Sequence, residues 1–157
     1  NRIYASNMKF RPSIGFGVDY IMFTPMGEYL GKWYPLQPMG TGGQNIPSTA
    51  PNPPAPYATS TLGAPVTAQL RYYLNKKTIF SFFATYHLAF TNYLDDVGPD
   101  PYPDPIAVGT NYPDNPAAAK YFANPTNRYV QKRQLRSGAS DVSDGFFTFG
   151  FTLAHHF

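Results

Sequence analysis

The 157-residue chain has no cysteine, which excludes a disulfide framework and a thiolate metal site. Charged residues are also scarce, and their 13% share is about half that of a typical soluble domain. The balance of 12 Lys and Arg against 9 Asp and Glu is only mildly basic, so it predicts no nucleic-acid partner. No apolar run reaches the roughly 18 residues that a membrane-spanning helix needs.

Aromatic residues and proline, in contrast, are abundant. Phe and Tyr occur 13 times each, and aromatic residues make up 17% of the chain. A surface that is poor in charge and rich in Phe and Tyr suits contact with lipid better than contact with water. All of the 17 prolines except Pro12 fall into two blocks, within residues 25–65 and 92–143. Because proline cannot donate to a strand ladder, these two blocks are predicted to be loops.

Four segments alternate apolar and polar residues with the period of two that indicates β-strands. They are residues 9–24, 66–74, 78–91 and 144–157, and the one competing helical pattern is a short patch at Ala117–Lys120. The strands are about 9 to 15 residues long, whereas strands of soluble sheets are most often about 5 to 6. A tilted transmembrane strand needs about 9 to 11 residues, so the lengths favour a membrane sheet over a soluble sandwich.

The connections between these segments alternate between long and short. Residues 25–65 and 92–143 form long loops, while Asn75–Lys77 is a tight turn. Outer-membrane barrels have short periplasmic turns and longer extracellular loops, so the alternation places Phe157 on the periplasmic side. We therefore predict an all-β fold, in which residues 1–157 form a single antiparallel, up-and-down transmembrane β-barrel domain in the bacterial outer membrane.

Four strands cannot close a barrel. The smallest common transmembrane barrels have about eight strands, and an open edge in lipid leaves unpaired backbone groups. We therefore expect this chain to be the C-terminal part of a barrel of about eight strands, with further strands before Asn1.

The last segment ends in an aromatic residue and has apolar residues at every second position before it. This pattern resembles the signal that the barrel-assembly machinery reads, and its residues here are Phe149, Phe151, Leu153 and Phe157. The same face is predicted to contact outer-membrane lipid. His155 and His156 are adjacent in this strand and point to opposite faces, so they do not readily share a metal ion.

Several charged groups are candidates for binding. Asp95, Asp96, Asp100 and Asp104 are weak Ca²⁺ candidates, because their spacing does not follow the EF-hand pattern and a solvated loop face explains them equally well. A basic cluster before the last strand, which either meets lipid phosphates or a partner or is simply solvated, comprises Arg128, Lys132, Arg133 and Arg136. Arg11, Asp19, Arg71 and His87 are predicted to face the barrel interior and to pair there.

The sequence has no G-x-S-x-G motif, no phosphate-binding loop and no metal-ligand spacing. Ser81, His87 and Asp19 lie on predicted strands, but nothing in their spacing brings them together. A lipid-modifying barrel enzyme would also need its triad on the outer surface near the lipid headgroups. We therefore predict a non-enzymatic protein with no catalytic residues and no required cofactor.

Two stretches in the loops carry a family resemblance. The segment from Trp33 to Gln44 resembles a W-x-x-L-Q-P-L-G-T-E-G-Q motif, and Phe90–Val97 resembles F-T-D-Y-L-D-D-V. The matching residues are Trp33, Leu36, Gln37, Pro38, Gly40, Thr41, Gln44, Tyr93, Leu94, Asp95 and Asp96. With Arg136, Gly138 and the aromatic last strand, the chain resembles the later strands of the PorG-like outer-membrane barrels of Bacteroidota. Gly42 departs from the usual Glu, and Asn92 from a frequent Asp.

The resemblance implies a role in the type IX secretion and gliding machinery, in which the barrel ties the outer membrane to a periplasmic ring of other protein subunits. Lys76 and Lys77, in the predicted periplasmic turn, are then the expected contact with those subunits. Two other functions stay open: a surface barrel whose long loops bind an extracellular partner or Ca²⁺, and a lipid-modifying barrel enzyme.

Overall fold

The computed structural model describes residues 9–46, 54–98, 102–125 and 143–156. These residues form two compact units, and each is described by itself. The sheet unit contains residues 9–21, 62–90 and 145–156, and the loop unit contains the remainder of the described chain.

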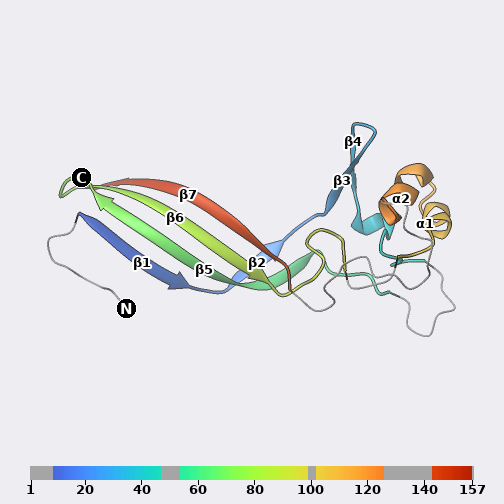
Figure 1. Ribbon diagram of the computed structural model, residues 1–157, viewed down its shortest axis with the longest axis horizontal. Coiled ribbons are helices and arrows are strands. Elements are labelled where there is room, and N and C mark those ends of the chain that lie inside the picture. The colour runs from blue at the N-terminus through green and yellow to red at the C-terminus, as the bar shows by residue number, and fades with distance from the viewer. Residues whose placement is uncertain (1–8, 47–53, 99–101, 126–142, 157) are drawn as a thin grey trace. The chain divides into compact units, whose positions relative to one another are not determined.

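The sheet unit is built from antiparallel strands. They are β1 (Phe10–Phe16), β2 (Asp19–Met22), β5 (Ser60–Tyr73), β6 (Thr78–Ala89) and β7 (Gly145–His155). Their order in the sheet is β1-β5-β6-β7, with β2 also paired to β5, so that β1 and β7 are the two edges among the described strands (Figure 1). The expectation of a mainly antiparallel β structure with few helices is thereby confirmed.

The strand bounds differ from the predicted ones where β1 and β2 pair with β5. The predicted segment 9–24 is two strands, interrupted at Gly17 and Val18, and β5 begins at Ser60 rather than at residue 66. Pro65 therefore lies inside a strand, where only Pro12 was expected. Gly17 donates its N–H to the Pro65 carbonyl at 3.2 Å, but proline has no N–H to return to Gly17. This missing ladder bond explains why the first strand breaks there.

Pairing across the sheet separates apolar from polar residues. Directly opposed residues share a face, and the register aligns Phe10 with Tyr72, Phe80 and Leu153 in one row. Further rows repeat the pattern, so one face carries the large apolar side chains of Phe10, Ile14, Phe16, Val66, Leu70, Phe80, Phe82, Tyr86, Phe147, Phe149, Phe151 and Leu153. All twelve are exposed, from 36% at Tyr86 to 80% at Phe16.

The opposite face of the sheet carries most of the polar residues, and its middle is better shielded. Ser81 and Thr85, both in the middle of β6, are each only 6% exposed. A water-soluble domain distributes its residues the other way, with apolar side chains inside and hydroxyls outside. In the sheet unit, large apolar side chains are exposed and hydroxyl groups in the middle of the opposite face are buried.

The loop unit is more ordered than the predicted loops. It contains the hairpin of β3 (Met26–Tyr29) and β4 (Lys32–Pro35), a short 3₁₀ helix η1 (Gln37–Met39), and the helices α1 (Pro105–Asn111) and α2 (Pro116–Ala123). Its small core consists of Met39, Val108, Ala118, Ala119 and Ala123. The predicted patch Ala117–Lys120 lies within α2, whereas α1 was not predicted. None of the helices in the described residues is long and apolar enough to span a membrane.

Both helices begin with a side-chain cap followed by proline. Asp104 accepts a hydrogen bond from the Ile106 N–H at 2.9 Å, and Asn115 accepts one from the Ala118 N–H at 3.0 Å. Proline at the first helical position loses no hydrogen bond, because that N–H has no partner within the helix. The Asp-Pro and Asn-Pro pairs are therefore helix starts within a proline-rich segment.

Candidate functional site

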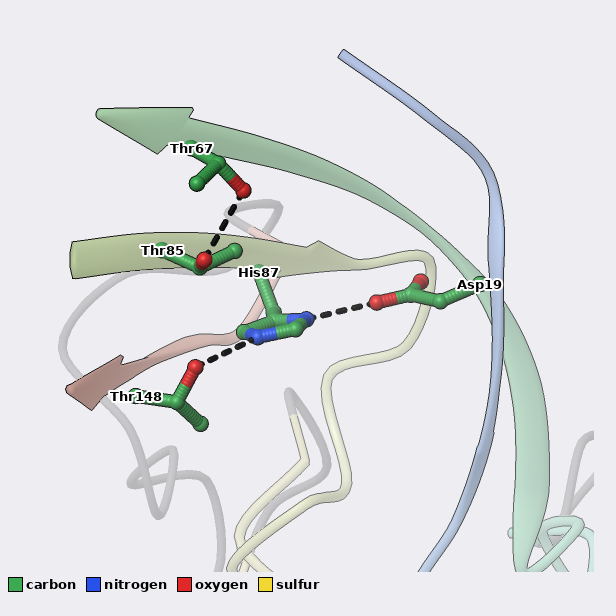
Figure 2. Close-up of polar contacts among 5 residues, drawn as sticks. All are labelled: Asp19, Thr67, Thr85, His87 and Thr148. Carbon is green, nitrogen blue, oxygen red and sulfur yellow. Dashed lines mark hydrogen bonds and ion pairs between the residues drawn. The ribbon is translucent and has the colours of Figure 1, made fainter. Parts of the chain in front are cut away.

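The polar face of the sheet holds a chain of three side chains that come from three strands (Figure 2). The His87 Nδ1 atom on β6 lies 2.6 Å from Asp19 Oδ2 on β2, and its Nε2 atom lies 3.0 Å from Thr148 Oγ1 on β7. The imidazole also stacks on the Phe146 ring, with centroids 4.6 Å apart and planes within 5°. These contacts fix the position and the plane of the ring, and we call the three polar residues the Asp–His–Thr site.

Asp19 reaches His87 only because glycine occupies position 63. The register that pairs Phe16 with Val66 brings Asp19 near Gly63 of β5, while His87 lies beyond it on β6. A Cβ atom built on Gly63 would lie 2.2 Å from Asp19 Oδ1, which is closer than real Cβ contacts come. The glycine therefore leaves the path that the carboxylate takes across β5.

The contacts of His87 define its chemistry. When Nδ1 carries the proton of the neutral ring, it donates a hydrogen bond to the Asp19 carboxylate. Nε2 then accepts a hydrogen bond from the Thr148 hydroxyl. The side chains of His87 and Asp19 are 19% and 23% exposed, so the ion pair they form when His87 is protonated is partly shielded from water. Thr148 is exposed. A hydroxyl, a base and a carboxylate are thus aligned, and the hydroxyl belongs to an exposed residue.

A row of threonines adjoins the Asp–His–Thr site. The register places Thr67, Thr85 and Thr148 opposite one another on β5, β6 and β7. The Thr67 and Thr85 hydroxyls are 2.8 Å apart and hydrogen bonded, as Figure 2 shows. Thr85 therefore presents a nearly buried hydroxyl next to Thr148.

The other two residues predicted to face the interior, Arg11 and Arg71, also lie on this polar face. Arg11 and Arg71 are opposite each other in the register, in a row that continues to Ser81 and Thr152. Arg71 Nε donates to Gln69 Oε1 at 3.1 Å, and the Arg11 guanidinium lies over the Tyr73 ring at 4.6 Å. Of the four predicted interior residues, Asp19 and His87 form the ion pair.

Ser81 is not part of the Asp–His–Thr site. It lies six residues before His87 on the same strand, a distance of roughly 20 Å along β6. The hydroxyl that meets His87 belongs instead to Thr148, on a strand far away in the sequence. Sequence reasoning missed Thr148 because only the β6–β7 register, which pairs Thr85 with Thr148, reveals the approach.

In the loop unit, the two stretches that carry the family resemblance meet at Asp96. Thr41 donates a hydrogen bond to Asp96 Oδ2, and the Tyr57 hydroxyl donates to Asp96 Oδ1 at 2.5 Å. The Tyr57 ring also stacks on Tyr93, with centroids 4.5 Å apart. Thr41 and Asp96 are buried, at 0% and 1% exposure. We call Thr41, Tyr57, Tyr93 and Asp96 the loop cluster; Tyr57 is the member that the sequence did not indicate.

The rest of the first stretch forms a tight, buried turn beside the loop cluster. Gly40 and Gly43 have φ angles of 65° and 92°, in the left-handed region that favours glycine. Gln44 is 1% exposed, and its Oε1 accepts the Gly42 N–H at 2.9 Å. Leu36 and Gln37 are half-buried, whereas Pro38 is exposed and Trp33 is 60% exposed. Most of these residues therefore shape the loop rather than face solvent.

The aspartates proposed for Ca²⁺ have separate local partners. Asp95 accepts the Val97 N–H at 2.9 Å, Asp104 caps α1, and Asp96 is buried in the loop cluster. Asp100 lies outside the described residues. Among the residues that the structure describes, no three His, Cys, Asp or Glu side chains gather as metal ligands. Calcium binding stays a prediction.

In the loop unit, Leu94 is hydrogen bonded to Asp144, the residue that precedes β7. The Leu94 N–H donates to Asp144 Oδ2 at 2.8 Å. Burial raises the pKa of the Asp144 carboxyl, the Leu94 hydrogen bond opposes that rise, and nearby Asp95 adds to it.

The β5–β6 turn and the last strand, β7, contain further residues that the sequence singled out. Lys76 and Lys77 lie exposed in the β5–β6 turn, which Asn75 stabilises by accepting the N–H groups of Lys77 and Thr78, each at 2.8 Å. Phe149, Phe151 and Leu153 are exposed on the apolar face. Phe157 lies outside the described residues, as do Arg128, Lys132, Arg133, Arg136 and Gly138.

Replacing Gly63 with alanine tests the passage of Asp19 across β5. The new Cβ would force Asp19 away from His87, so we expect the G63A protein to lose about 1–3 kcal/mol of stability in urea titrations. Gly15→Ala is the matched control, because a Cβ there would meet Thr67 at an ordinary 4.0 Å. In a D19A background the cost of G63A should fall; an unchanged cost would show that Asp19 is not what the methyl group displaces.

Replacing Tyr57 with phenylalanine tests the loop cluster. The variant keeps the ring that stacks on Tyr93 but removes the donor to the buried Asp96 carboxylate, which should cost about 1–3 kcal/mol locally. We expect faster hydrogen exchange at the amides of residues 40–44. Tyr121→Phe, at an exposed position of α2, should leave that exchange unchanged. Equal exchange in the two variants would contradict a stabilising role for the Tyr57 hydroxyl.

Comparison with known proteins adds no relative: no family model, no curated protein and no solved structure matches the chain.

Proposed function

We propose that the chain is part of an outer-membrane β-barrel that acts as a structural, anchoring component of an envelope protein assembly. The observation that carries this proposal is the distribution of side chains on the two faces of the sheet. Twelve large apolar side chains are exposed on one face, and the other face holds the hydroxyls, the Asp19–His87 pair and two arginines. An apolar face in contact with lipid and a polar interior are what a transmembrane barrel requires.

The lengths of the strands support the same proposal. β5, β6 and β7 have 14, 12 and 11 residues. A tilted strand needs about 9 to 11 residues to cross the hydrocarbon core. Aromatic pairs such as Phe80 with Phe151 and Tyr86 with Phe147, at 5.8 and 4.9 Å between centroids, connect neighbouring strands on the apolar face. The face is thus a continuous apolar surface rather than a set of isolated side chains.

In this proposal the sheet closes through strands other than those described, from this chain or from another. Both β1 and β7 are edges among the described strands. An edge in lipid leaves backbone N–H and C=O groups without hydrogen bonds, at several kcal/mol each. A barrel of about eight strands removes both edges.

The anchoring role rests on the resemblance to PorG-like barrels together with the polar turn. That resemblance implies a link between the outer membrane and a periplasmic ring in type IX secretion and gliding. The β5–β6 turn is short, rigidly closed by Asn75, and presents Lys76 and Lys77 to solvent. In the proposed orientation this turn lies in the periplasm.

A pair of glutamate variants tests the proposal that the apolar face contacts lipid. Phe151→Glu places a carboxylate on the apolar face, and we expect it to prevent insertion of the full chain into lipid vesicles, measured by protease protection. Thr152→Glu, at the next residue on the polar face and in the row of Arg71, should insert as the unchanged protein does. Equal insertion of both variants, or better folding of F151E in water, would favour a soluble sandwich.

Photo-crosslinking in intact cells tests the anchoring role. A crosslinking residue at position 76 or 77 is expected to capture periplasmic subunits, whereas one at Trp33 in the loop unit serves as the comparison. Capture of extracellular partners at position 33 together with none at 76 or 77 would contradict anchoring and support the surface-binding alternative.

A further inference from the structure

We propose that the Asp–His–Thr site is a nucleophilic centre, in which Thr148 attacks small, water-soluble carboxylic esters. This activity is independent of the anchoring role and departs from the sequence-based expectation of a protein without catalytic residues. What carries it is the alignment in Figure 2 of a carboxylate, an imidazole and an exposed hydroxyl.

The distances match those of an activated hydroxyl nucleophile. Such a site needs the hydroxyl and its base within about 2.6–3.2 Å, and the base oriented by a third group. Here the Thr148 Oγ1–His87 Nε2 distance is 3.0 Å and the His87 Nδ1–Asp19 Oδ2 distance is 2.6 Å. The stack on Phe146 adds a second restraint on the ring plane. Asp19 acts through His87 and is therefore a positioning residue.

Access and charge stabilisation also point to Thr148. Thr148 is an exposed residue, whereas His87 and Asp19 are partly shielded. Thr85 lies directly opposite Thr148, and its hydroxyl is already oriented by a 2.8 Å bond to Thr67. When the Thr67 hydroxyl donates in that pair, the Thr85 hydroxyl keeps its own proton and can donate it to an oxyanion that forms at Thr148.

The placement of the site limits its substrates. Thr148 is on the polar face, opposite the face that carries Phe147 and Phe149, so ester groups of bilayer lipids that contact the apolar face do not reach it. Phe146 lies on the same face as Thr148, two residues earlier, and provides an apolar surface for a short acyl chain. The β-methyl group of threonine crowds the attacking oxygen, which also favours a small acyl group.

The reaction proceeds by two acyl transfers. Thr148 Oγ1 bonds to the ester carbonyl carbon while its proton passes to His87 Nε2, and Asp19 stabilises the resulting imidazolium. The carbon–oxygen bond to the leaving alcohol then breaks, and the alkoxide takes that proton. Water attacks the acyl-threonine with His87 again accepting and returning a proton, so that one ester and one water become one acid and one alcohol.

The test uses the full chain, folded in detergent micelles, with p-nitrophenyl acetate as substrate and a fluorophosphonate as covalent probe. We expect hydrolysis above the rate with free imidazole, and a phosphonyl adduct that mass spectrometry locates on Thr148. Thr148→Val should abolish the adduct, and Thr148→Ser should restore it. Thr152→Val, on the same strand and face, is the matched control and should label normally.

The variant Asp19→Asn separates positioning from structure. If Asp19 only stabilises the sheet, D19N changes the unfolding midpoint and leaves turnover of the folded protein unchanged. If it holds the His87 tautomer, kcat falls by about 10³–10⁴-fold while KM stays the same. No adduct on Thr148 in protein whose folding is verified by circular dichroism, or equal labelling of T148V, would overturn the proposal.

Discussion

The register between β5, β6 and β7 is the constraint on which the rest of the structure depends. Side chains alternate with a period of two, so a slip of one residue would move every phenylalanine to the polar face and every threonine to the apolar one. The same pairing that aligns Phe80 with Leu153 also aligns Thr85 with Thr148. The apolar surface and the Asp–His–Thr site are thus two results of one set of backbone hydrogen bonds.

Two residues without ordinary side-chain roles shape the polar face. Pro65 interrupts the ladder to β1, which separates β2 and allows Asp19 a strand of its own; Gly63 leaves the space through which Asp19 extends. Their joint effect is that a carboxylate from one side of β5 binds an imidazole from the other side. Substitution at Pro65 is therefore expected to act on the ion pair through the backbone, and substitution at Gly63 by filling the space that Asp19 needs, although neither residue carries a charge.

Periodicity predicted the four strand regions, the faces of their side chains and the short turn, because alternation over ten or more residues leaves little ambiguity. It did not predict the break after Phe16, since that break depends on Pro65 in a different strand. The ion pair of Asp19 with His87 joins residues 68 positions apart in the sequence, and Thr148, the third member of the site, is 61 positions from His87. The hairpin and α1 were missed because proline was interpreted as a breaker, whereas Pro105 begins a helix that Asp104 caps.

The short turn between β5 and β6, residues 74–77, has a consequence for the order of folding. β5 and β6 meet across this turn at almost no cost in loop entropy, whereas β7 must return to β6 after residues 90–144. The β5–β6 hairpin can therefore form early, and β7 joins it late. The helices and the loop cluster reduce that delay, because each internal contact shortens the flexible length that has to be closed. Until β7 arrives, the open edge of β6 exposes its backbone, so a slow last step would make the chain dependent on a chaperone.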